Sequence, residues 1–152
     1  MTVTITKQLE SISLKPPKAR KELDDLTINN IGQLRIIHKY CFEDLSDEDW
    51  LKDYDTKLIY FNDICVGGIS SKHVGEIVNI AAISVLPAYR SLGLGRMLME
   101  YLIEKTRNFK PTLLDTKPLY IAGLVNDESM GFFEKFGFVK DDQEITNMTL
   151  TL

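Results

Sequence analysis

The chain has 152 residues, of which 44% are hydrophobic and 26% charged, and its formal net charge at pH 7 is −4. This length and apolar content favour one compact domain with a core of its own, and the negative charge argues against a protein that binds DNA or RNA over its whole surface. Because the longest apolar stretch, 80–86, is far shorter than the roughly 20 residues of a membrane-spanning helix, and the first residues lack the apolar core of a signal peptide, we expect a soluble, cytoplasmic protein.

A basic segment precedes the predicted domain. In 15–21, four positive charges surround two prolines, and we interpret this segment as a solvated linker; docking on an acidic partner or on RNA is the alternative. Residues 1–21 are accordingly expected to form a flexible N-terminal extension, and 22–152 the folded domain.

The first part of the domain is predicted to contain two helices and a hairpin. Apolar residues at three- and four-residue steps predict a helix over 31–41, and Ser46, followed by acidic residues, is expected to begin a short second helix. Strands over 58–61 and 64–69 flank Asn62-Asp63, which is typical of a tight hairpin turn. The two cysteines, Cys41 and Cys65, lack metal-ligand spacing, so we interpret them as core thiols and predict no metal site.

In the second part, strands alternate with helices. A strand over 76–85 is followed by a helix with one apolar stripe from Leu94 to Leu102, and a further strand covers 119–125. Asn126 is then expected to begin a helix that stops at Gly137. The segments 138–139 and 147–150 are predicted to form a last pair of strands.

The segment 90–95, Arg-Ser-Leu-Gly-Leu-Gly, stands where the strand over 76–85 should stop and the next helix begin. Glycine lets the backbone approach a ligand closely, and the first N–H groups of a helix carry a partial positive charge, so we predict a phosphate-binding loop. An ordinary strand-to-helix turn with a surface arginine is the alternative. The spacing matches neither a P-loop nor a dinucleotide-binding fingerprint, which would need a third glycine where Leu98 stands.

Together with Asn126, Ser129 and the segment 132–138, Phe-Phe-Glu-Lys-Phe-Gly-Phe, the order of these motifs resembles the GCN5-related N-acetyltransferase (GNAT) superfamily. Within it, the segments 29–34, 60–67 and 135–138 are similar to the branch that contains the catalytic subunit of N-terminal acetyltransferase E (NatE). The resemblance covers about residues 22–139. It implies an α/β (α+β) fold in which two central strands of a mixed sheet, here about 76–85 and 117–125, splay apart.

The resemblance implies acetyl-CoA as the cofactor, held in the gap between those two strands. Its pantetheine would pair with the backbone of 83–86, its pyrophosphate would bind the amides of 90–96, and the helix that begins after Asn126 would flank the other side. The implied cofactor-binding residues are Ile83, Val85, Leu86, Arg90, Ser91, Leu92, Gly93, Leu94, Gly95, Arg96, Asn126, Ser129 and Phe133.

The implied reaction is direct attack of a neutral amine on the acetyl thioester, with the backbone N–H of Val85 or Leu86 stabilising the developing oxyanion. A protein α-amine has a reference pKa of about 7.7 to 8, so that a useful fraction is already neutral near pH 7 and a strong base is not obligatory.

The chain departs from the family where catalytic side chains are expected. Asn79 stands at the position of a tyrosine, and Ile121, which cannot titrate, at the position of a histidine. Phe133 stands where many members carry a general-acid tyrosine. In the implied substrate pocket, Phe42 keeps an aromatic wall, whereas Glu43 and Asp44 replace apolar neighbours and would favour a positively charged amine.

Three functions remain open from the sequence. The first is an N-terminal acetyltransferase acting on the α-amine of a peptide or protein, with the subunits of the larger N-terminal acetyltransferase A assembly as implied partners. The second is a catalytically weak accessory subunit that retains acetyl-CoA. The third is an acetyltransferase for lysine or small amines.

Overall fold

The computed structural model describes residues 19–27, 29–41, 53–141 and 147–152. Within these residues, seven strands form one mixed sheet in the order β1-β2-β3-β4-β5-β7-β6. No helix in the described part of the chain is long and apolar enough to cross a membrane. The elements are β1 (Lys21–Asp25), α2 (Ile31–Cys41), β2 (Asp55–Phe61), β3 (Ile64–Val74), β4 (Ile77–Val85), the 3-10 turn η2 (Pro87–Tyr89), α3 (Leu94–Arg107), β5 (Tyr120–Leu124), α4 (Asp127–Glu134), β6 (Val139–Lys140) and β7 (Asn147–Thr151).

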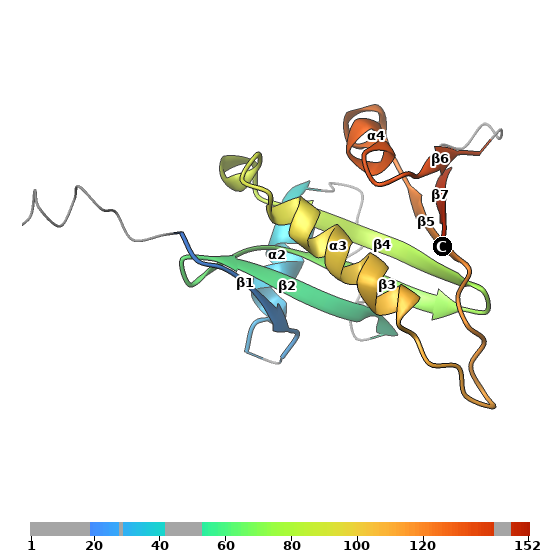
Figure 1. Ribbon diagram of the computed structural model, residues 1–152. Coiled ribbons are helices and arrows are strands. Elements are labelled where there is room, and N and C mark those ends of the chain that lie inside the picture. Colours follow the sequence, from blue (N-terminus) through green and yellow to red (C-terminus); the bar gives the residue numbers. More distant parts are fainter. Residues whose placement is uncertain (1–18, 28, 42–52, 142–146) are drawn as a thin grey trace, which may run out of the picture.

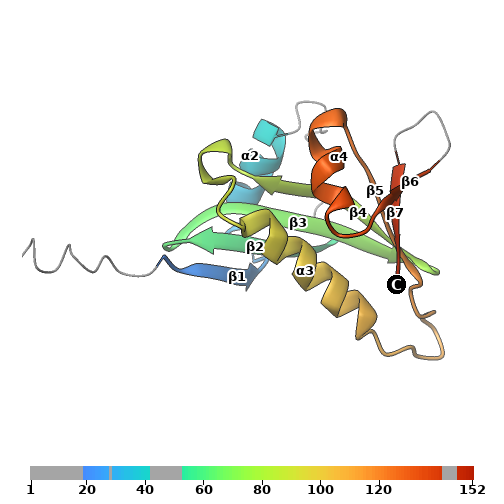
Figure 2. The same ribbon diagram turned by 45° about the horizontal axis from the view of Figure 1, so that its top comes forward.

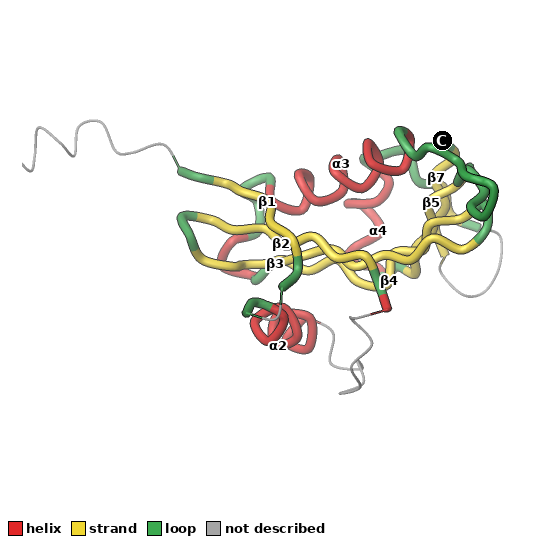
Figure 3. The backbone as a smooth tube through the Cα atoms, turned by 90° about the horizontal axis from the view of Figure 1, so that it is seen from below, coloured by secondary structure: helices red, strands yellow, loops and turns green. Residues whose placement is uncertain are grey.

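The sheet separates two layers of helices. Helix α2 lies on one face, and α3 and α4 lie on the other (Figures 1 and 3). The larger core fills the α3 and α4 side, while Leu34 and Leu58 centre a smaller core beneath α2. A Cβ on Gly68 would lie 2.6 Å from Leu34 Cδ1, so that this glycine allows α2 to pack closely on β3.

Local turn chemistry explains the predicted hairpin. Asn62 and Asp63 both have positive φ, 47° and 68°, as the two central residues of a type I′ turn require. Asparagine and aspartate tolerate this region better than other non-glycine residues, and the turn twist matches the twist of the flanking strands. The predicted hairpin is therefore confirmed, with β2 and β3 longer than the expected strands.

The central strands β4 and β5 run parallel and then separate. Their register joins Ile77–Ile80 to Tyr120–Gly123, whereas β4 continues to Val85. At the C-terminal end of the chain, β7 pairs with β5 and with the short β6 (Figure 2). This arrangement confirms the predicted α+β fold with a mixed sheet.

The edge strand β1 was not expected from the sequence. It begins at Lys21, the last residue of the predicted extension, and pairs with β2 in antiparallel register. Only Leu23 of its five residues is even partly buried, so the strand carries no hydrophobic alternation and is held by backbone pairing at an edge. The boundary between residues 21 and 22 remains a prediction, and the helix predicted from Ser46 lies outside the described residues.

Candidate functional site: a backbone cradle where two strands part

The loop between β4 and α3 turns through left-handed backbone. Ser91 has φ 68° and Gly93 has φ 81°, and Gly93 is the N-cap of α3 with no side-chain hydrogen bond to the helix. At this N-terminus, the first N–H groups of an α-helix have no intrahelical acceptors. Arg90 Nε donates to the Val85 carbonyl at 2.9 Å, which closes the loop onto the end of β4. We call this loop, residues 90–96, the cradle, because its backbone groups at a helix N-terminus could hold an anion.

A lysine distant in sequence adds positive charge to this loop. Lys21 Nζ, on β1, donates to the Leu92 carbonyl and lies 3.9 Å from where a Gly93 Cβ would stand. Arg96, in the first turn of α3, forms an ion pair with Glu100 at 2.8 Å. The sequence interpretation missed Lys21, because it ends a basic segment that looks like a linker and nothing local links it to Leu92.

The start of α3 packs against α4 as well as against β4. A Cβ on Gly95 would lie 3.3 Å from the Phe132 ring and 3.9 Å from Val85 Cγ2. The first turn of α3, the middle of α4 and the end of β4 therefore meet beside the cradle.

One of the two backbone amides predicted to face the reaction is bonded within the sheet. Leu86 N–H donates to the Val66 carbonyl at 2.9 Å and so belongs to the β3 side of β4. The prediction of Leu86 as an oxyanion donor is therefore corrected, because its only backbone proton is already in this bond. Successive residues of a strand direct their N–H groups to opposite edges, so the amides of Ile83 and Val85 are directed to the edge where β4 and β5 part.

The predicted cofactor residues on α4 mainly hold the helix. Asn126 Oδ1 accepts from Ser129 N–H at 2.8 Å, and Ser129 Oγ accepts from Asn126 N–H at 3.1 Å, which together form a capping box. Phe133 is 2% exposed, and its ring lies 3.3 Å from where a Gly123 Cβ would stand. These residues fix the start of α4 and its packing beside the divergence of β4 and β5.

The structure does not bring Asn79 and Ile121 together. Asn79 is exposed and in register with Ala122, whereas Ile121 is fully buried in the core on the α3 and α4 side. Val78 and Ile80, the neighbours of Asn79, also belong to that core, so Asn79 lies on the opposite face of the sheet. Neither Asn79 nor Ala122, which share a face, can act as a proton-transfer group.

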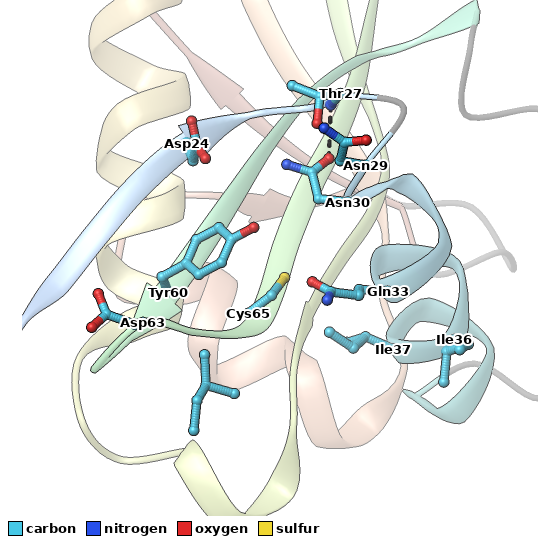
Figure 4. Close-up of a pocket in the computed structure, with 11 residues that line it drawn as sticks. Asp24, Thr27, Asn29, Asn30, Gln33, Ile36, Ile37, Tyr60, Asp63 and Cys65 are labelled. Atoms are coloured by element: carbon cyan, nitrogen blue, oxygen red, sulfur yellow. Dashed lines mark hydrogen bonds between the residues drawn. The ribbon is translucent and has the colours of Figure 1, made fainter.

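The substrate residues Phe42, Glu43 and Asp44 lie outside the described residues. A groove of about 690 Å³ on the α2 side contains none of the predicted cofactor residues (Figure 4). Burial raises the pKa of Tyr60 and of Cys65 in this groove, so both side chains keep their protons at neutral pH. Its lining residues are Asp24, Thr27, Asn29, Asn30, Gln33, Ile36, Ile37, Tyr60, Asp63, Ile64 and Cys65.

Comparisons with known proteins agree with this geometry. N-alpha-acetyltransferase 50 of Danio rerio is 31% identical over 80% of this chain and 76% of its own length. An uncharacterized N-acetyltransferase of Schizosaccharomyces pombe is 28% identical over 86% of this chain and 96% of its own length.

Among solved structures, Arabidopsis thaliana Naa50 in complex with the bisubstrate analogue CoA-Ac-MVNAL is similar, with a TM-score of 0.72 and 26% identity. The similarity covers 87% of this chain and 99% of that one. Residues 26–138 match the model of the acetyltransferase (GNAT) family. The sequence comparison and the structural comparison therefore agree on the family. The chain is a member of the GNAT acetyltransferase family.

Proposed function

We propose that this chain transfers an acetyl group from acetyl-CoA to the α-amine of protein N-termini. The observation that carries the proposal is the backbone cradle at Gly93, placed where β4 continues to Val85 beyond its pairing with β5. The similarity to Arabidopsis Naa50, whose complex holds the bisubstrate analogue CoA-Ac-MVNAL, supports a peptide amine as the acceptor. We propose a cytoplasmic location, where protein N-termini are made.

The residues of the cradle fit a pyrophosphate group. Gly93 has positive φ and open space where a side chain would stand, apart from Lys21 Nζ at 3.9 Å. Anions are favoured at a helix N-terminus, and the Lys21 ammonium adds a full positive charge beside that of the helix dipole. Leu92 and Arg90 hold the loop through their bonds to Lys21 and to Val85.

Acetyl-CoA, when bound, supplies a thioester whose carbonyl carbon an amine can attack. The chain contributes the amide of Val85, which is directed to the edge where β4 leaves β5 and can donate to a carbonyl oxygen placed there. Because a protein α-amine has a pKa of about 7.7 to 8, a useful fraction is neutral near pH 7. The chain therefore needs to orient the amine more than to deprotonate it.

A second candidate function follows from one specific observation. Asn79 has no titratable group and lies on the face opposite Ile121, so the positions aligned with the family's tyrosine and histidine supply no base. An accessory subunit that keeps acetyl-CoA and binds the subunits of an N-terminal acetyltransferase A assembly would need no base. Acetylation of lysine or a small amine is a third outcome of the same test.

The test incubates the chain with acetyl-CoA and peptides that vary in their first residue, together with peptides whose only free amine is a lysine side chain. Mass spectrometry should find acetyl groups on α-amines, enriched for certain first residues. Product on lysine alone would contradict the proposal, and bound acetyl-CoA without product would favour the accessory subunit.

Two glycine variants, one in the cradle and one away from it as a matched control, test acetyl-CoA binding. Gly93→Glu places a carboxylate in the cradle and should abolish acetyl-CoA binding, because like charges repel there. Gly75 has φ 61° and open space around it in the turn between β3 and β4. Gly75→Glu introduces the same charge and similar backbone strain away from the cradle, and should bind acetyl-CoA as the parent chain does.

A further inference from the structure

A buried histidine connects α2 to the two central strands beneath it. His38, in the last turn of α2, is 1% exposed. Its Nδ1 lies 2.5 Å from Ser84 Oγ on β4, and its Nε2 lies 3.3 Å from Ser70 Oγ on β3. Ser70 Oγ in turn lies 2.9 Å from Thr56 Oγ1 on β2. A line of imidazole and hydroxyl groups therefore crosses three strands under the helix.

This line replaces apolar contacts that would be easier to bury. His38 lies one turn after Leu34, which is fully buried, so an aliphatic side chain would continue the packed face of α2. Polar groups cost free energy in such an interface unless they are hydrogen-bonded. Burial lowers the pKa of His38 to about 4, so the ring is neutral at physiological pH and offers one donor and one acceptor.

The two serines differ in what holds them. Ser70 lies in β3, a central strand paired with β2 on one side and β4 on the other. Ser84 lies in the part of β4 that continues past the register with β5, where β3 is its paired strand among the described residues. A restraint from α2 therefore matters more at Ser84 than at Ser70, and Ser84 directly precedes Val85.

We propose that His38 is a positioning residue for acyl transfer, whose Nδ1 bond to Ser84 fixes the end of β4, and with it the Val85 amide, against the last turn of α2. The expected effect on kcat rests on the proposed function, whereas the restraint on the end of β4 does not. The bond to Ser70 anchors the ring within the sheet and does not set the position of the amide. The two ring nitrogens therefore have separable roles.

Two amide variants test the two nitrogens separately. The side-chain amide of asparagine overlaps Nδ1 of histidine, so His38→Asn keeps a partner for Ser84; the glutamine amide reaches the position of Nε2, so His38→Gln keeps a partner for Ser70. Losing a hydrogen bond of ordinary strength corresponds to a change of about tenfold in a rate or equilibrium constant. His38→Gln should lower kcat by about that factor, and His38→Asn should stay close to the parent chain.

Two serine variants repeat the test with His38 in place. Ser84→Ala should lower kcat about tenfold. Ser70→Ala removes the same hydroxyl from the neighbouring strand and should leave kcat close to that of the parent chain. A purely structural role would lower the melting temperature of both variants alike, without separating their kcat values.

Amide hydrogen exchange gives a readout that does not depend on turnover. Exchange across 81–86 should be faster in Ser84→Ala and in His38→Gln, and unchanged in Ser70→Ala and His38→Asn. Equal effects of the two serine variants on exchange and on kcat would overturn the inference. If the parent chain acetylates no amine, the proposed function fails, while the exchange comparison still decides whether His38 holds the end of β4.

Discussion

Lowering the pH from 7 to 4 should destabilise this fold through His38. Burial lowers the pKa of this imidazole from 6.5 to about 4. Between these two values the unfolded chain binds a proton that the folded chain does not, so the free energy of unfolding decreases as the pH falls. At about 1.4 kcal/mol per pH unit, the loss reaches an upper limit of about 3 kcal/mol near pH 4. Above pH 7, His38 is neutral in both states and contributes no pH dependence.

The assay is urea unfolding of the parent chain and of His38→Asn at a series of pH values. Subtracting one curve from the other removes every titration that the two proteins share. Asp25 is one such group: its bond to Lys57 lowers the pKa of the carboxyl below 3.8, so the stability that it contributes is present above that value and lost below it. This loss falls outside the window of His38.

The difference between the two unfolding free energies should change by up to about 1.4 kcal/mol per pH unit between pH 6.5 and 4, and level off above pH 7. Parallel curves would refute the reasoning. They would mean that the protonated ring is as well accommodated in the folded state as in the unfolded state, for example by donating to both serine hydroxyls.

Three further substitutions, two of them paired with a control variant, test the cradle, the sheet and the core. Lys21→Met should weaken acetyl-CoA binding, as measured by calorimetry, about threefold at low salt and less at high salt. The control variant Lys110→Met should bind as the parent chain does. Equal affinities of Lys21→Met and the parent chain would restrict Lys21 to a structural role. Gly67→Ala places a Cβ 2.1 Å from the Ser84 carbonyl oxygen and should lower the free energy of unfolding in urea by about 1–3 kcal/mol. Its control, Gly32→Ala, lies at an open helical site and should leave the free energy of unfolding unchanged or raise it. Ile121→His should cost about 2–5 kcal/mol without raising turnover, because the side chain is fully buried; a stable variant with higher turnover would contradict this placement.

Features set by local chemistry could be predicted from the sequence. Asn62-Asp63 specifies a hairpin turn because both residues tolerate positive φ, and Gly93 ends the β4–α3 loop for the same reason. Asn126 and Ser129 lie three residues apart, the spacing that a capping box requires. The fold class followed from the order of such signals along the chain.

Features set by distant pairing could not be predicted in this way. The strand β1 presents charged side chains at a sheet edge, so its pairing with β2 leaves no periodic signal. The bond from Lys21 to the Leu92 carbonyl joins residues 71 positions apart. Likewise, nothing in the local sequence indicates that Leu86 N–H donates to the Val66 carbonyl.

The placement of His38 against Ser84 depends on one irregularity in the sheet. Between β3 and β4 the register shifts, so that Ser70 pairs with Ala82 while Ser71 pairs with Ile80. In a regular strand, Ser84 would share a face with Ile80, which packs in the core on the α3 and α4 side. The extra residue in β4 turns Ser84 to the α2 face, where it meets His38. A bulge that redirects a side chain in this way therefore joins the buried imidazole to the end of β4, where the Val85 amide proposed for acyl transfer lies.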